Sequence, residues 1–351
     1  MERLLPSYPL FVKDPNFSFW SASDQLNKRD TESWYGEKKR IYGFIKTRGK
    51  TWCFLGDAER FAPYGVEAAE QTELKVSAFA TEYVFRLDCG RLSVRFVSPL
   101  PPEDPELVSM PVCYMEYAYE GEGEAEVSLF AFGELCYNSQ IENKIDRRLR
   151  GAVLPLDGFE AACLGLCRQI PLSNCEDECG ADWGWWYLAG EQAFIADEKD
   201  LFAYLCAGNS AFTADTEEKC LCAVNRMAKG AILIAYDDIV SIDYFGDHLK
   251  GLYLSEHTII EALSAVWQGY DGIDARLQKF SEGLYEKAEK YGVEYKHILN
   301  ASLRQSVAAH KLVRNREGEL LFLSKECDSN GCIATVDVSY PSMPLYLLSN
   351  P

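Results

Sequence analysis

The hydrophobic pattern of this chain changes its period once, near Ser255, and this change restricts the folds that the chain can adopt. Before this point, short apolar segments alternate with polar residues and are separated by turn signals such as Cys89–Gly90, as in antiparallel strands. After it, apolar residues recur at helical spacing. The segments with this spacing are 258–271, 273–292 and 294–315. We therefore expect a β-rich part followed by a helical part.

The β-rich part is predicted to be one large antiparallel β-sandwich, because many short strands with turns between them are typical of that architecture. A second hairpin is expected around the turn 120–123. The helices that follow carry apolar faces that need partners, and helix pairs of this kind usually stack into rings or superhelices. We assign 1–240 to the sandwich, 241–257 to a linker and 258–351 to the first helices of an α/α toroid.

The charge balance excludes some functions. The 351 residues include 35 basic and 54 acidic side chains, a formal net charge of −19. Such a surface repels phosphates, so nucleic-acid binding is not expected. No signal peptide and no apolar run of membrane-spanning length is visible, and the odd number of cysteines, 13, fits reduced thiols. We predict a cytoplasmic protein that does not bind membranes.

The corner at 318–351 carries the main candidate chemistry. A strand, a turn at Ser329–Gly331 and a helix with Pro341 in its first turn are predicted there. Glu326 and Asp337 flank the turn, and paired carboxylates are what glycoside hydrolysis requires. In the alternative interpretation, Asp337 only caps the helix. The residue pattern leaves both interpretations open.

Aromatic side chains beside acids form two further candidate sites, because such groups can stack on a sugar ring. Trp20, Asp24 and Trp34 lie in a segment predicted to be a loop, where binding residues gather. The second group lies on a predicted strand, whose alternate residues would face a core. Its members are Asp182, Trp183, Trp185, Trp186 and Tyr187.

No metal site and no cofactor is predicted. Four cysteines have spacings that approach those of zinc ligands, but they are looser than in zinc ribbons, and buried thiols are the alternative. These are Cys163, Cys167, Cys175 and Cys179. The histidines form no zinc-hydrolase pattern, and the sequence contains no nucleotide-binding or serine-hydrolase motif.

Several segments together resemble the glutaminase A family of fungi and bacteria. Four successions are similar to the signature corner of that family: Ser324–Glu326, Ser329–Gly331, Thr335–Val338 and Tyr340–Pro344. The opening 8–20, the segment 94–117 and the tryptophan-rich segment 181–189 are similar to further family segments. The resemblance extends over essentially the whole chain.

The resemblance implies a β-sandwich followed by a helical toroid of the six-hairpin glycosidase type, more than half of which is absent from this sequence. It also implies a hydrolase of L-glutamine with its site between sandwich and toroid. A glycoside hydrolase with paired carboxylates is a close alternative, and a non-catalytic fragment that binds carbohydrate or another ligand is a second one. The pair Cys327–Asp328 and the loop 28–30 depart from the family pattern, which puts the substrate in doubt.

The predicted catalytic residues are Asp337 and Glu326, and we expect the site to be incomplete in this chain. The predicted substrate-binding residues are Trp20, Asp24, Trp34, Asn330 and Tyr340. The expected partner is a small molecule, either glutamine or a sugar. Exposed helix faces also leave a homo-oligomer open.

Overall fold

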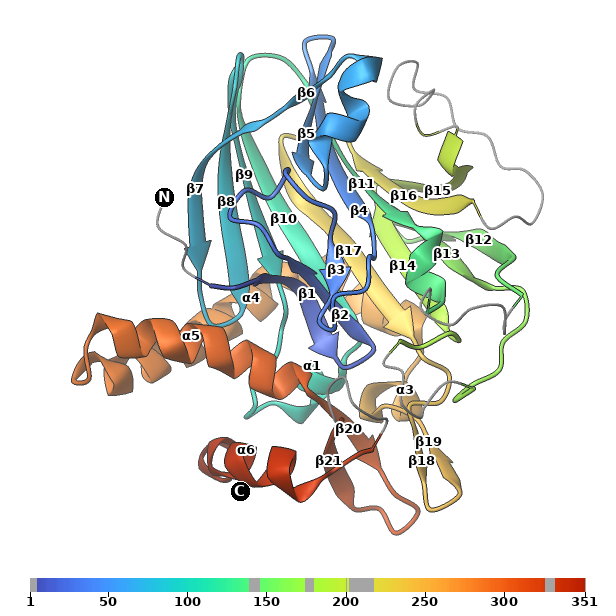
Figure 1. Cartoon of the computed structure of the whole chain (residues 1–351), viewed down its shortest axis with the longest axis vertical. Coiled ribbons are helices and arrows are strands. Elements are labelled where there is room, and N and C mark those ends of the chain that lie inside the picture. The colour runs from blue at the N-terminus through green and yellow to red at the C-terminus, as the bar shows by residue number, and fades with distance from the viewer. Residues whose placement is uncertain are drawn as a thin grey trace.

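A computed structural model of the chain describes residues 5–138, 146–173, 180–199, 201, 218–325 and 332–350. These residues form a β-sandwich followed by helices, as the sequence predicts (Figure 1). The boundaries between sandwich, linker and helical part remain predictions.

The larger sheet of the sandwich has eight strands, and all its neighbouring strands are antiparallel. In spatial order they are β12 (Leu149–Leu156), β13 (Phe159–Leu166), β14 (Trp185–Gly190), β17 (Lys229–Asp237), β10 (Val112–Gly121), β9 (Gly90–Val97), β8 (Ala80–Leu87) and β7 (Glu70–Val76). The hairpin predicted at Cys89–Gly90 is confirmed, because it joins β8 to β9.

The second sheet has six strands and packs against the first. In spatial order they are β15 (Gln192–Asp197), β16 (Lys219–Asn225), β11 (Ala125–Phe132), β4 (Ile41–Thr47), β5 (Lys50–Leu55) and β6 (Val66–Ala68). The 3₁₀ helix η1 (Ala58–Tyr64) covers its outer face, where the ring of Phe61 meets Tyr42 and Phe44 edge-on.

The prediction of a hairpin at 120–123 is wrong. β10 pairs with β9 and β17 in the larger sheet, whereas β11 pairs with β4 and β16 in the smaller one. The chain therefore crosses from one sheet to the other at this turn. Alternating apolar residues mark both strands as lying on a core, but they do not specify which strand each one pairs with.

Short elements surround the sandwich. β1 (Tyr8–Asp14), β2 (Phe17–Ser21) and β3 (Glu32–Ser33) form a small sheet of their own. The remaining short elements are α1 (Pro105–Ser109), η2 (Gly133–Cys136), β18 (Ile242–Tyr244), β19 (Asp247–Leu249) and α3 (Leu252–Glu256).

The first two predicted helices are a single one, α4 (Ile259–Glu289). A capping box starts it: Thr258 Oγ1 accepts from the Glu261 N–H, and the Glu261 carboxylate accepts from the Thr258 N–H. The helix continues through Gly269 and Gly272, where glycine costs only about 1 kcal/mol against alanine. Burial of its apolar face outweighs that cost.

The third predicted helix is shorter than expected. α5 (Val293–Ala308) ends before His310, and β20 (His310–Arg314) pairs with β21 (Leu320–Ser324). Leu312, which is expected in a helical stripe, is therefore a strand residue. The apolar run of β21 needs a partner strand, and this tertiary requirement overrides the local helical spacing. The strand predicted at β21 is confirmed.

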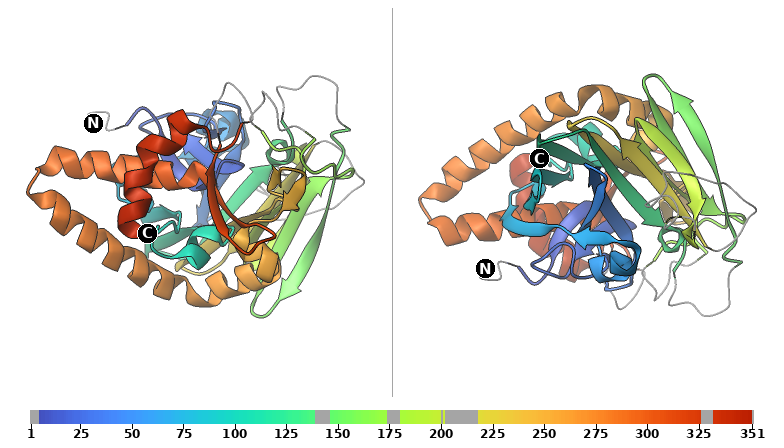
Figure 2. Two further views of the ribbon diagram at one scale, coloured as in Figure 1. Left: turned by 90° about the horizontal axis from the view of Figure 1, so that it is seen from below. Right: turned by 90° about the horizontal axis from the view of Figure 1, so that it is seen from above.

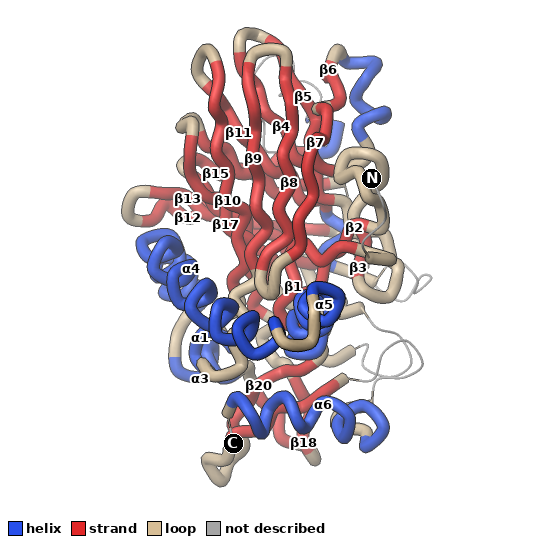
Figure 3. The backbone as a smooth tube through the Cα atoms, turned by 90° about the vertical axis from the view of Figure 1, so that its left-hand side faces the viewer, coloured by secondary structure: helices blue, strands red, loops and turns tan. Residues whose placement is uncertain are grey.

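Two apolar cores flank the larger sheet, and neighbouring residues of β17 belong to one each. Ile234 faces the smaller sheet and lies in the same core as Leu129 of β11, a strand of that sheet. Leu233 faces outward and joins Leu263 of α4 in the core beneath the helices. Figure 3 shows α4 and α5 crossing the lower ends of the strands. In the described part of the chain, no helix is long and apolar enough to cross a membrane.

Candidate functional site

A fully buried arginine connects the helical segment to the sandwich. The Arg304 side chain of α5 is 0% exposed and donates to the Ala80 carbonyl oxygen at 3.1 Å and to Thr81 Oγ1 at 3.0 Å. It also reaches the carbonyl oxygens of Pro9 and Ser77. Burial lowers the pKa of Arg304 to about 9, so the group remains charged at neutral pH.

A buried ion group makes a second connection. Lys311 Nζ of β20 lies 2.7 Å from Asp14 Oδ2 and 2.8 Å from Asp238 Oδ2. Burial alone lowers the pKa of Lys311, but the two carboxylates outweigh burial and raise this pKa above its ordinary value. The orientation of the hairpin β20–β21 relative to the sandwich is thereby fixed.

A cavity of about 290 Å³ lies between the sandwich and this helical segment. Its walls come from the α1 region, from the hairpin β20–β21 and from the last helix, α6 (Val336–Ser349). The lining residues are Pro102, Pro105, Val108, Leu312, Leu320, Phe322, Tyr346 and Asn350. An apolar wall with a few polar groups is typical of small-molecule sites.

The predicted start of the last helix is wrong. Pro341 is expected in the first turn, but α6 begins at Val336, and both Pro341 and Pro344 lie inside it. Neither proline can donate to the carbonyl four residues earlier, which leaves the Asp337 and Tyr340 carbonyl oxygens without those intrahelical bonds. The preference of proline for the first turn did not indicate how far the helix extends before it.

The two described members of the predicted corner lie on the outside of α6. Asp337 is exposed in the first turn of the helix, and Tyr340 is 73% exposed. Glu326 and Asn330 lie outside the described residues. Lys325 and Ile333 form a single antiparallel bridge on either side of that segment. Thr335, and not Asp337, is the N-cap residue of α6, and its side chain makes no capping hydrogen bond.

The cavity and the predicted catalytic carboxylate are separated along α6. Asp337 precedes Tyr346 by nine residues, which corresponds to ~13 Å along a helix axis. The cavity is lined by Tyr346 and Asn350, near the other end of the helix. A substrate that uses both features must therefore be extended.

No sequence motif indicates the aromatic cluster at the cavity wall. The buried ring of His310 stacks on Phe322, with centroids 4.7 Å apart, and Tyr346 meets it edge-on at 4.9 Å. A lone histidine between a helix and a strand, such as His310, belongs to no recognisable motif. The helical spacing predicts that the helix at 294–315 includes His310, whereas this residue begins β20.

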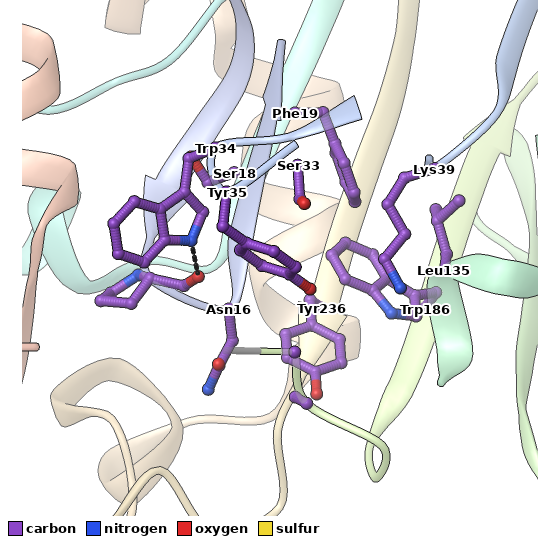
Figure 4. Close-up of a pocket in the computed structure, with 13 residues that line it drawn as sticks. Asn16, Ser18, Phe19, Ser33, Trp34, Tyr35, Lys39, Leu135, Trp186 and Tyr236 are labelled. Atoms are coloured by element: carbon purple, nitrogen blue, oxygen red, sulfur yellow. Dashed lines mark hydrogen bonds between the residues drawn. The ribbon is translucent and has the colours of Figure 1, made fainter. Parts of the chain in front are cut away.

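Trp34 lines a different and much smaller pocket beside β2 (Figure 4). The indole N–H of Trp34 donates to the Pro15 carbonyl oxygen at 3.0 Å. The stacked rings of Trp186 and Tyr236 also border this pocket, so the two aromatic groups predicted from the sequence meet here. Its volume of about 20 Å³ has room for a single water molecule.

The charged groups beside this pocket already have partners. Lys39 Nζ lies 2.9 Å from Glu37 Oε2 and donates to the Glu134 carbonyl oxygen at 2.7 Å. Burial lowers the pKa of Lys39, although Glu37 opposes the change. The Tyr35 hydroxyl donates to the same carboxylate at 2.6 Å. In this conformation the pocket offers little to a polar substrate.

The other two predicted N-terminal binding residues make local contacts. Trp20 lies half-buried on β2 and donates to Ser18 Oγ at 2.9 Å. Asp24 accepts a hydrogen bond from the Tyr8 hydroxyl at 2.6 Å. No hydrogen bond or ring contact found among the described residues joins Trp20, Asp24 or Trp34 to α6.

Two of the four cysteines with zinc-like spacing lie on β13 or just after it. Cys163 is buried on β13, and Cys167 is half-buried just after that strand. Cys175 and Cys179 lie outside the described residues. Within the described ranges, no cluster of three His, Cys, Asp or Glu side chains could hold a metal ion.

The comparisons with known proteins agree with this arrangement. Residues 292–351, which include α5, the hairpin β20–β21 and α6, match the glutaminase A six helical-hairpin domain. Over 99% of its length, the chain also aligns with glutaminase A of Aspergillus oryzae, at 24% identity. The chain belongs to the glutaminase A family. The predicted resemblance is thus confirmed.

Two further family models match most of the remaining sequence of this glutaminase A family member. Residues 2–61 and 81–287 match two domains of unknown function (DUF4964 and DUF5127). A probable glutaminase of Arthroderma benhamiae is 23% identical over 99% of the chain. The alignments cover 54% and 46% of the two relatives, so the chain spans about half the length of the curated relatives it matches.

Proposed function

We propose that this chain supplies part of the active site of a hydrolase that acts on L-glutamine, at the junction of the sandwich and the helical segment. The observation that carries the proposal is the cavity of about 290 Å³, because both parts of the chain line it. Both curated relatives carry glutaminase in their names. Junctions between domains are common positions for small-molecule sites.

Asp337 is the proposed catalytic carboxylate of the described chain. It is exposed in the first turn of α6. Tyr340, one turn later, is proposed to contact the substrate. Glu326 as second carboxylate and Asn330 as binding residue remain predictions, as do Trp20, Asp24 and Trp34.

Glycoside hydrolysis is the second candidate, and the separation along α6 favours it. A carboxylate ~13 Å along the helix from the cavity suits an extended substrate whose far end rests on Phe322 and Tyr346. Aromatic rings commonly stack on sugars, and a pair of carboxylates performs this chemistry.

Turnover and calorimetric titration of the complete protein with glutamine and with a series of oligosaccharides test these functions. Asp337→Asn is expected to reduce turnover at least a hundredfold while the melting temperature stays nearly unchanged. Asp157→Asn, at an exposed turn residue between β12 and β13, is the matched control and should behave like the wild type. Binding of oligosaccharides alone, strengthening with their length, would replace the glutamine proposal by the second candidate. Neither binding nor turnover of any of them would refute both.

A further inference from the structure

One buried imidazole connects the hairpin β20–β21 to the last helix. The His310 ring is 5% exposed and lies between Phe322 of β21 and Tyr346 of α6. The rings of Phe322 and Tyr346 also contact each other edge-on, at 4.8 Å. The three rings therefore form a closed cluster that α6 shares with both strands.

Hydrogen bonds define the protonation of this ring. His310 Nδ1 lies 2.8 Å from the Ser306 carbonyl oxygen of α5, a distance that requires a proton between them. The Tyr346 hydroxyl donates to the same carbonyl oxygen at 2.9 Å. With its proton on Nδ1, the neutral ring has an acceptor at Nε2, and Ser342 Oγ of α6 lies 3.5 Å from that atom.

Elsewhere in the part of the chain that the structure describes, α6 makes few polar contacts with other elements. Ser339 Oγ lies 2.9 Å from Ser324 Oγ, and the Asn350 amide reaches the Pro102 carbonyl oxygen at 3.5 Å. No residue of α6 is fully buried, and Leu348 is 86% exposed. Seen from below, the helix lies across α5 rather than within a bundle (Figure 2). Among the described residues, the contacts around His310 are therefore a large share of the polar contacts that hold α6 in place.

We propose that neutral His310 is a positioning residue, which holds α6 and the Asp337 and Tyr340 it carries against the hairpin β20–β21, and that protonation of the ring releases the helix. The roles of Asp337 and Tyr340 rest on the proposed function. The docking of α6 does not, and it can be measured without turnover.

Burial gives this docking its dependence on pH. Burial lowers the pKa of His310, and the hydrogen bond to Ser306 opposes it only in part. When α6 leaves, the ring meets water and takes up a proton more readily, so the undocked state binds more protons. Docking is therefore unaffected well above the ordinary histidine pKa of ~6.5 and weakens as the pH falls from there through the lowered value.

Charged groups on the surrounding elements do not offset a charge on the ring. Several charged groups of the described chain on these elements are exposed or paired elsewhere: Glu106 of α1, Glu256 of α3 with Arg314 of β20, Arg304 of α5, Lys311 with Asp14 and Asp238, and Asp337 of α6. Lys325, which follows the strand partner Ser324 of His310, has the same sign of charge as a protonated ring and cannot offset it. The only titratable group of the described chain in contact with the ring is the Tyr346 phenol, whose pKa burial raises, so it stays neutral.

Amide hydrogen exchange of the 351-residue chain at pH 7.5 and pH 5, corrected for intrinsic exchange rates, tests the proposal. Protection of α6 should fall at pH 5, roughly tenfold for each unit by which docking lowers the His310 pKa, while protection of α4 stays constant. His310→Gln should lower the protection of α6 at both pH values and abolish its pH response. Tyr346→Phe should weaken protection but keep the response. His297→Gln, at an exposed histidine of α5, is the matched control.

Wild-type protection of α6 that does not change with pH would overturn the proposal, as would a pH response that survives in His310→Gln. If that variant fails to fold, an NMR titration of the wild-type His310 ring decides instead: titration at the ordinary histidine value refutes the proposal, and titration below it supports it. Asp337→Asn should leave the exchange pattern unchanged, so failure of the proposed function and failure of this inference are distinguishable.

Discussion

Lys311 Nζ lies 2.7 Å from Asp14 Oδ2, although the two residues are 297 positions apart in the chain. Asp238, at the exit of the sandwich, completes the ion group from the other side at 2.8 Å. One cation from the helical segment therefore compensates two buried carboxylates of the sandwich part.

Lys311→Met should destabilise the protein strongly, because it leaves Asp14 and Asp238 buried without their cation. We expect the free energy of unfolding to fall by about 3–5 kcal/mol, measured by urea denaturation. Lys287→Met, at an exposed lysine of α4, should change it by less than about 0.5 kcal/mol. Adding Asp14→Asn to Lys311→Met should recover part of the loss. Equal stability of the two lysine variants would show that the ion group does not hold the hairpin.

Arg304→Met should also be destabilising, because the Ser77 carbonyl oxygen and Thr81 Oγ1 lose the donor that Arg304 supplies, whereas the Pro9 and Ala80 carbonyl oxygens keep their bonds from Thr81 and Ser77. Unpaired buried polar groups cost about 1–3 kcal/mol each, so we expect a loss of about 2–6 kcal/mol in the same denaturation experiment. Arg314→Met removes the exposed pair with Glu256 and an exposed hydrogen bond to the Gly318 carbonyl oxygen, and it should cost less than about 1 kcal/mol. A similar small loss in both variants would contradict a structural role for Arg304.

Replacing glycine by alanine should have opposite effects on stability inside α4 and in the turn that follows it. A side chain at Gly272 meets open space, so Gly272→Ala should stabilise the protein by about 0.5–1 kcal/mol. Gly292 has φ +96°, a region that other residues avoid, and Gly292→Ala should destabilise it by about 1–3 kcal/mol. Thermal unfolding measures both. Destabilisation by Gly272→Ala would mean that α4 is not a continuous helix.

Asp237→Asn should stabilise the protein in a pH-dependent manner. Burial raises the pKa of Asp237, so the folded state binds more protons than the unfolded state between the ordinary aspartate pKa of ~3.9 and the raised value. The wild type therefore loses stability as the pH rises through that window, and the variant escapes this loss. Its melting temperature should exceed that of the wild type at pH 7, and the difference should shrink near pH 4. A difference independent of pH would exclude titration of Asp237 as its cause.

The sequence allowed the sandwich and the helical segment to be predicted because they depend on local periodicity. β8, β9 and β21 follow from alternation, and the start of α4 agrees with the capping pattern at Thr258 and Glu261. Pairing between strands depends on residues far apart in the sequence, so the assignment of β10 and β11 to two different sheets could not be predicted. Family segments located the corner around Asp337. The cavity and His310 could not be predicted, because their partners come together only through tertiary packing.

The first strand of the chain has a consequence for the order in which the protein assembles. β1 supplies Asp14 to Lys311 and the Pro9 carbonyl oxygen to Arg304, so its partners are synthesised nearly three hundred residues later. Contacts at such sequence separation slow folding, because a long loop must close before they form. During synthesis Asp14 therefore lacks its lysine partner until β20 emerges from the ribosome. The contacts of β1 are completed only after α5 and β20 have been made.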